Sequence, residues 1–359
     1  VEILTLEDCL RIGIDNNLSL EGKRKEIQKS KYGVSENRSK LLPQINAIAG
    51  YNNNFDPPVS VTDGSSYGVP YNITQTLQHS ANAGLEMQMP LFNQTLYTSM
   101  SIAKVMEEIS RLSYGKARED VILQISKMYY LGQVTAEQIM LIKANITRLE
   151  ELRDITQAFF DNGMSMEVDL KRVNINLENL KVQYDNAQAM MKQQLNMLKY
   201  IMDYPAEKEI ALTPVNTDSI TTVALTGLSE NIYELQLSQS QVQLAERQKK
   251  IITNGYIPSL SLTGSWRYAA YTDKGYHWFH SGPSNQWFRS YGVGLTLRIP
   301  IFDGLDKTYK IKKAMIDREN KRLAWEDARK NLQTQYLNAV NDLMNNQRNF
   351  KKQKDNYLL

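Results

Sequence analysis

The chain carries one arrangement of short motifs twice. Residues 41–51 and 256–266 are similar to each other, and each is an alternating segment punctuated by a proline. Residues 83–93 and 292–303 form a second similar pair, and each of these runs straight into a long polar stretch with helical character. A duplication of this length constrains the fold before any single residue is considered, because both copies must adopt one plan.

Four segments alternate between apolar and polar residues with a period of two, which predicts β-strands. Leu85, Met87 and Met89, for example, alternate with Glu86 and Gln88. The four predicted strands cover residues 43–56, 80–91, 258–272 and 286–301.

Two kinds of surface could receive the apolar faces of these strands. A soluble sandwich needs more strands to form a core, whereas a transmembrane β-barrel has apolar-out, polar-in strands of at least about 9–11 residues, with aromatic residues near the interfaces. The favoured interpretation is the membrane barrel, because aromatic residues gather toward the loop ends of the strands. The predicted membrane-interface aromatics are Tyr51, Phe55, Trp266, Tyr268, Trp287, Phe288 and Tyr291.

Four strands cannot close a barrel by themselves. An open edge in lipid leaves backbone groups without partners, and closure needs about eight or more strands. We therefore expect several copies of the chain to share one barrel.

The remaining stretches are free of proline and predict long helices, since an interior proline costs about 3 kcal/mol. The segment 93–160 would extend roughly 100 Å as one helix, and apolar residues within it and within 165–203 recur with heptad spacing, typical of supercoiled helices. Asn162 and Gly163 predict the stop between these two helices, and Ser165 predicts the cap of the second. The predicted helices cover residues 5–41, 93–160, 165–203, 218–253 and 303–359.

Composition excludes several functional classes. The net charge of +3 gives no case for nucleic acid, and no run of about 18 apolar residues is available for a spanning helix. No catalytic constellation or phosphate-binding loop can be assembled, so neither an enzyme nor a cofactor is expected. His277 and His280 lack a carboxylate or thiol partner, so no metal site is predicted. Cys9 cannot form an internal disulfide and is interpreted as a small buried residue.

In this order, these motifs make the chain resemble the TolC family of outer-membrane efflux proteins. The likeness rests on motifs in residues 4–20, 42–45, 90–93 and 160–170, which recur in part within residues 229–235, 257–260 and 300–303. Each motif has low specificity by itself, but the same order repeated twice makes the resemblance specific.

The resemblance implies an α-helical tunnel through the periplasm below a twelve-stranded barrel, formed by a homotrimer. The two internal repeats would cover residues 1–212 and 213–359, with a mixed equatorial region near 203–218. It also implies a periplasmic adaptor protein, an inner-membrane pump and a site in the outer membrane of a Gram-negative bacterium.

The resemblance assigns roles to the helix turn. The tip that contacts the adaptor would comprise Asn162, Gly163, Met164 and Ser165. Val168 and Asp169 would lie near the periplasmic aperture. The duct would conduct passively, gated where the helices change packing. A ring of Asp169 would favour cations if it faces the channel, and Asp169 would be a latch if it pairs with a basic side chain on a neighbouring helix.

The second repeat departs from this plan. Ala117 aligns with Ala328, so Leu359 corresponds to Arg148, before the first repeat reaches its turn. We therefore expect the second hairpin and its gating residues to follow residue 359.

Two rival functions remain, together with a choice of cargo. An autonomous porin would close its barrel with one chain, and a soluble coiled-coil scaffold would be extracted without detergent. Drug, metal and protein export are not distinguished by the sequence, and neither is lipidation of the N-terminus.

Overall fold

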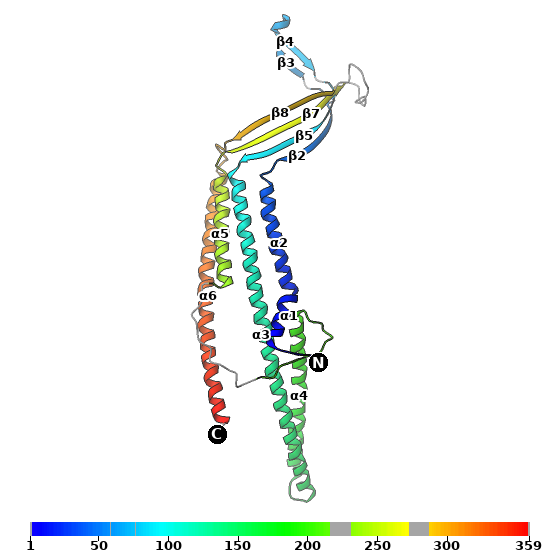
Figure 1. The fold of residues 1–359 in the computed structure, drawn as a ribbon, viewed down its shortest axis with the longest axis vertical. Coiled ribbons are helices and arrows are strands. Elements are labelled where there is room, and N and C mark those ends of the chain that lie inside the picture. Colours follow the sequence, from blue (N-terminus) through cyan, green and yellow to red (C-terminus); the bar gives the residue numbers. More distant parts are fainter. Residues whose placement is uncertain (1, 58, 76, 216–230, 273–286, 358–359) are drawn as a thin grey trace. The chain divides into compact units, whose positions relative to one another are not determined.

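A computed structural model describes residues 2–57, 59–75, 77–215, 231–272 and 287–357, so His277 and His280 lie outside the described residues. The fold is a mixture of long helices and strands (Figure 1). The helices are α1 Leu6–Asn16, α2 Leu18–Ser39, α3 Gln94–Asp161, α4 Glu167–Met202, α5 Tyr233–Asn254 and α6 Asp306–Tyr357, with a short 3₁₀ helix, η1, at Ser65–Tyr67. The strands are β1 Glu2–Leu4, β2 Gln44–Asn53, β3 Val59–Asp63, β4 Tyr71–Gln75, β5 His79–Phe92, β6 Ile210–Leu212, β7 Ser259–Thr272 and β8 Trp287–Arg298.

The chain divides into two compact units, and each draws on both halves of the sequence. Unit 1 comprises residues 1–29, 108–239 and 324–359. Unit 2 comprises residues 30–107 and 240–323.

The predicted helix over 5–41 is wrong as one continuous element, because Asn17 divides it into α1 and α2. Asn17 leaves helical geometry with ψ 117° while its backbone N–H still bonds to Gly13 O. Its side chain accepts from the N–H of Leu20 at 3.0 Å and donates to Ile201 O at 2.7 Å. One asparagine thus ends the first helix, caps the second and ties both to α4.

Other boundaries move by a few residues. The predicted helix over 303–359 begins only at Asp306, because Gly304 and Leu305 have positive φ and the Asp303 carboxylate accepts from the N–H of Lys307. The predicted strand over 286–301 ends at Arg298, which pairs with the first residue of β7, Ser259. Of the predicted helix over 218–253, the structure describes α5 from Tyr233, and residues 216–230 lie outside the described part.

In unit 2, the four predicted strands form one antiparallel sheet in the order β2-β5-β7-β8 (Figure 1). The strand that joins the two halves of the sequence is β5, which pairs with β7 from His79–Thr272 to Phe92–Leu260, with a register shift near Pro90. The segment between β2 and β5 contains a second hairpin, β3 paired with β4.

In unit 1, helices α1, α3 and α4 and the first turn of α2 pack around one apolar cluster. Its fully buried members include Cys9, Leu20, Ile125, Leu198 and Met202. The heptad pattern predicted within 93–160 agrees with the burial of Val121, Ile125, Thr135 and Ile142, of which the first two belong to this cluster. The short parallel pair of β1 and β6 that borders this cluster was not predicted from the sequence, although β6 lies within the region near 203–218 that was expected to be mixed.

No helix within the described residues is both long and apolar enough to cross a membrane.

Candidate functional site

The four-stranded sheet of unit 2 has one apolar and one polar face, and its register aligns like residues in rows across the strands. Ala47, Leu85, Trp266 and Tyr291 form one apolar row. Asn46, Glu86, Ser265 and Gly292 form the neighbouring polar row. Each strand therefore presents its polar side chains to the same side of the sheet.

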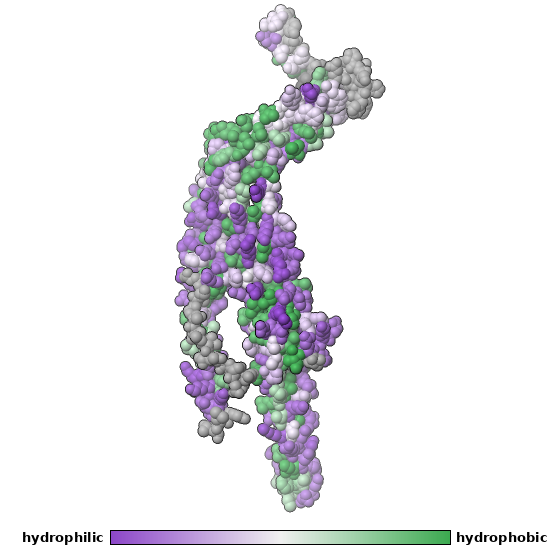
Figure 2. All heavy atoms as spheres, in the orientation of Figure 1, coloured by the Kyte–Doolittle hydropathy of each residue, from purple (hydrophilic) through white to green (hydrophobic). Residues whose placement is uncertain are grey.

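The apolar face is exposed to an unusual degree. On β8, Tyr291, Val293 and Leu295 are 76%, 79% and 66% exposed. Figure 2 shows hydrophobic side chains gathered over the helix-side ends of the sheet, whereas hydrophilic side chains predominate over the parts of α5 and α6 that belong to the same unit. A contiguous exposed apolar surface of this kind is typical of a protein or lipid interface.

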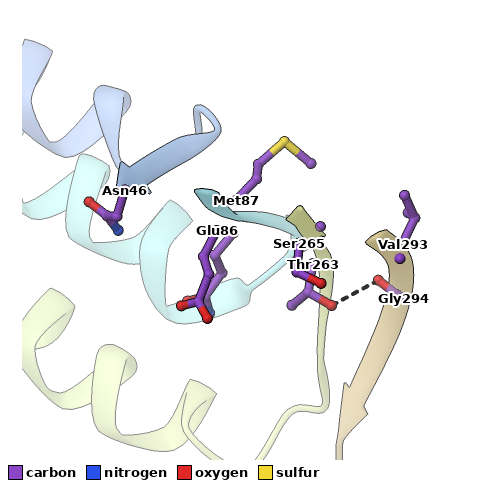
Figure 3. Close-up of a pocket in the computed structure, with 10 residues that line it drawn as sticks. Asn46, Glu86, Met87, Thr263, Ser265, Val293 and Gly294 are labelled. Carbon is purple, nitrogen blue, oxygen red and sulfur yellow. Dashed lines mark hydrogen bonds between the residues drawn. The ribbon is translucent and has the colours of Figure 1, made fainter. Parts of the chain in front are cut away.

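The polar face contains a shallow hollow of about 480 Å³, shown in Figure 3. Asn46 and Glu86 lie on this side, whereas Met87 and Val293 project to the other side of the sheet (Figure 3). Thr263 spans toward β8 and donates to Gly294 O at 3.2 Å. Gly292 and Gly294 add no side chain to the hollow from β8, and the space beside Gly292 is open.

One ion pair crosses the polar face. The guanidinium of Arg267 on β7 donates to the carboxylate of Glu86 on β5, although the backbone register pairs Arg267 with Gly84. A Cβ at Gly84 would lie 2.8 Å from the Cα of Arg267 and 2.3 Å from Trp266 O. Glycine is therefore required where the two strands approach, next to the diagonal pair.

The predicted interface aromatics are distributed unevenly. Tyr51, Trp266, Tyr268, Trp287 and Tyr291 fall on the apolar face by register. The Tyr51 hydroxyl lies 2.8 Å from Nδ1 of His79, and the rings of Trp266 and Tyr268 meet edge to face at 5.3 Å.

The two other predicted interface aromatics differ from this group. Phe288 pairs with Ala269 in a row of the polar face, one residue out of phase with Trp287. Phe55 follows the end of β2 and is 87% exposed.

The turn between α3 and α4, in unit 1, forms as the sequence predicts. Gly163 adopts φ +71°, its N–H bonds to Phe160 O at 2.9 Å, and the N–H of Met164 bonds to Phe159 O at 2.8 Å. These two bonds constitute a Schellman motif, which satisfies the last carbonyls of α3. The Asn162 side chain adds a bond to Ala158 O at 2.7 Å.

The predicted capping role of Ser165 is wrong. The cap residue of α4 is Met166, whose side chain makes no capping bond, and the Ser165 hydroxyl donates to Thr156 O of α3 at 3.4 Å. The turn thus uses Ser165 to hold the two helices together. The first turn of α4 instead carries Glu167 and Asp169, whose negative charges complement the helix dipole.

Hydrophobic side chains gather at this turn, as Figure 2 also shows. Phe159, Met164, Met166 and Val168 are all exposed, and Met164 reaches 76%. Asp169 is exposed beside them, with its carboxylate 3.9 Å from Arg172 one turn later. The turn therefore combines an apolar surface with an acidic rim.

Sequence reasoning missed the Glu86–Arg267 pair. The alternation placed both residues on polar faces, but no signal in the sequence indicated that β5 and β7 are neighbours. Among the described residues, no group of three or more acidic, histidine or cysteine side chains could hold a metal ion.

Comparison with known proteins gives this geometry a context. The model of the family "Outer membrane efflux protein" matches residues 12–202, more than half of the chain. "Outer membrane protein TolC" of Vibrio cholerae is 21% identical over 319 residues, which cover 86% of this chain. The matched region spans 66% of that relative's length.

Solved structures share the fold. A structure of CusC has a TM-score of 0.74 at 16% identity, covering 96% of this chain and 78% of that one. The MtrE outer membrane channel of Neisseria gonorrhoeae has a TM-score of 0.68 at 19% identity, covering 97% of this chain and 74% of that one. At these identities the likeness concerns the fold alone.

Proposed function

The chain belongs to the outer membrane efflux protein family, and from this premise we propose that it forms the exit channel of a tripartite efflux or type I secretion system. It would lie in the outer membrane, extend into the periplasm and conduct cargo passively. A partner pump would supply the energy. The cargo would be selected by the pump.

The observation that carries this proposal is the sheet of unit 2. It has an exposed apolar face, a polar face and, within the described part of the chain, end strands β2 and β8 that each pair on one side only. In lipid such edges must be paired, because each unsatisfied backbone group costs several kcal/mol. Three copies joined through β2 and β8 would give a twelve-stranded barrel with the apolar face toward lipid.

The aromatic residues support this orientation, with one exception. Tyr51, Trp266, Tyr268, Trp287 and Tyr291 would face lipid near an interface, as aromatic girdles do. Phe288, on the polar face, would line the channel instead.

The internal duplication provides the framework of the channel. Residues 1–212 and 213–359 would be two repeats of one plan, each contributing two barrel strands. The sheet joins them through β5 and β7.

The exposed turn between α3 and α4 supports the remaining assignments. Its apolar surface around Met164, with Asn162, Gly163 and Ser165, would contact a periplasmic adaptor. Val168 and Asp169 would lie at the periplasmic aperture, where Asp169 would attract cations or serve as a latch.

The first experiment measures oligomeric state and conductance. The protein extracted in detergent should have the mass of three chains, and in planar bilayers it should give discrete conductance steps. A single-chain channel would favour a porin. A monomer in detergent-free buffer would favour a soluble scaffold and would overturn the proposal.

The aperture role is tested with Asp169→Ala. We expect altered conductance or ion preference, because removing the charges changes either the field at the aperture or the latch. Glu178→Ala is the control, since Glu178 lies on the same helix and pairs with Lys181 at 3.1 Å. If the Asp169 variant matches the unmodified channel in both properties, neither role survives.

A further inference from the structure

We propose that Glu86 and Arg267 form a self-neutralising charge pair that keeps the sheet-lined part of the channel without strong preference for ion sign. The inference rests on the proposed function, because it needs the polar face to line a conduit. It adds a residue-level determinant of what the channel passes.

Charged residues are scarce on the polar face of the sheet. Along the polar face of β2, β5, β7 and β8, alternation and register leave only Glu86, Arg267 and Arg298 as charged residues. Arg298 is the last residue of β8, at the end of the ladder. The interior of the polar face therefore carries one negative and one positive side chain.

These two charges form an ion pair. Arg267 reaches diagonally past Gly84 to the Glu86 carboxylate, so their fields cancel at short range. Both side chains are nevertheless about half exposed on the face that holds the hollow, at 41% for Arg267 and 46% for Glu86. An ion passing this face would meet a dipole, whereas removal of either partner would expose a full charge.

The hollow beside the pair contains no other charged residue. Apart from Glu86, the residues that line the hollow are neutral, and those of β8 are Gly292, Gly294 and Val293, whose side chain projects to the other side of the sheet. Within this hollow nothing else can compensate a charge left by a substitution. In a trimer, three such charges would add at one level of the channel.

The experiment removes each charge in turn and then exchanges the two. The reversal potential of each variant is measured in planar bilayers under a salt gradient, and it gives the ratio of cation to anion permeability. Glu86→Gln should turn the preference toward anions and Arg267→Gln toward cations. Each change in the permeability ratio should be about fivefold at 0.1 M salt, taking three charges about 10 Å from the ion in water, and should largely vanish at 1 M salt. The exchanged variant Glu86→Arg with Arg267→Glu should restore the unmodified ratio.

Arg289→Gln is the matched control. Arg289 pairs with Tyr268 in a row of the apolar face, so removing its positive charge should leave the ratio unchanged. Both single variants could instead keep the ion selectivity of the unmodified channel and differ only in thermal stability. The pair would then only stabilise the contact between β5 and β7, and the inference would be wrong. Absence of any channel in the unmodified protein would instead refute the proposed function.

If the single variants fail to assemble, charge can be added chemically to an assembled channel. Ser265→Cys leaves both charges in place, and Ser265 lies directly opposite Glu86 in the register. Anionic and cationic thiosulfonate reagents should then shift the ratio in opposite directions on the assembled channel. If neither reagent shifts it, this level of the sheet does not control ion preference and the inference is wrong.

Discussion

Replacement of Gly163 by alanine should destabilise the turn between α3 and α4, and the free-energy cost can be worked out from the structure. Gly163 has φ +71°, and a Cβ added there would meet nothing within 4 Å, so the cost is purely one of backbone conformation. The left-handed region costs a residue with a side chain about 1–2 kcal/mol. Part of this cost is offset because alanine restricts the unfolded chain, by about 0.4–1 kcal/mol. A net cost of about 1 kcal/mol remains, which raises local opening roughly fivefold.

Hydrogen exchange measured by mass spectrometry reads this opening directly. The amides of residues 163 and 164 donate to Phe160 O and Phe159 O, so peptides covering 159–166 should exchange roughly fivefold faster in Gly163→Ala. Gly163→Asn should show a smaller change, because asparagine tolerates this conformation better.

Gly22→Ala is the control, because this glycine-to-alanine change should increase stability where Gly163→Ala decreases it. Gly22 lies inside α2, has open space around it and does not have positive φ, so alanine should stabilise the helix by about 0.5–1 kcal/mol. Exchange at the turn that is no faster in Gly163→Ala than in the unmodified protein would show that the turn does not depend on the Schellman geometry.

Three further predictions concern packing and a thiol. Gly13→Ala should destabilise by about 1–3 kcal/mol in thermal unfolding, since its Cβ would lie 2.3 Å from Cδ1 of Ile125, and adding Ile125→Val should recover part of the loss; fully additive effects would contradict this contact. Thr98→Val should cost about 1–3 kcal/mol by the same assay, because buried Asn254 donates to the Thr98 hydroxyl at 2.6 Å and would lose its acceptor; an unchanged midpoint would refute this. Burial raises the pKa of the Cys9 thiol to about 11, so the neutral thiol persists until the pH approaches that value and maleimide labelling at pH 8 should proceed only after denaturation; rapid labelling of the folded protein would contradict the buried position.

The local elements could be predicted from the sequence because their signals are local. A period of two marked β2, β5, β7 and β8 and assigned most of their residues to the correct face. The Asn162–Gly163 stop appeared where the structure has a Schellman motif, since only residues that tolerate positive φ end a helix in this way. The Asn17 break was missed, because its decisive bond goes to Ile201, a residue distant in sequence.

By itself, the sequence determined which segments are strands and helices, and it pointed to the family through motifs that recur in order. Only the tertiary structure decided that β5 lies beside β7, that β1 pairs with β6, and that Glu86 meets Arg267 across Gly84. The physical reason is that periodicity reports which side of an element is apolar, whereas neighbours and register depend on backbone pairing between distant segments. A charge pair on a sheet exists only once that pairing is made.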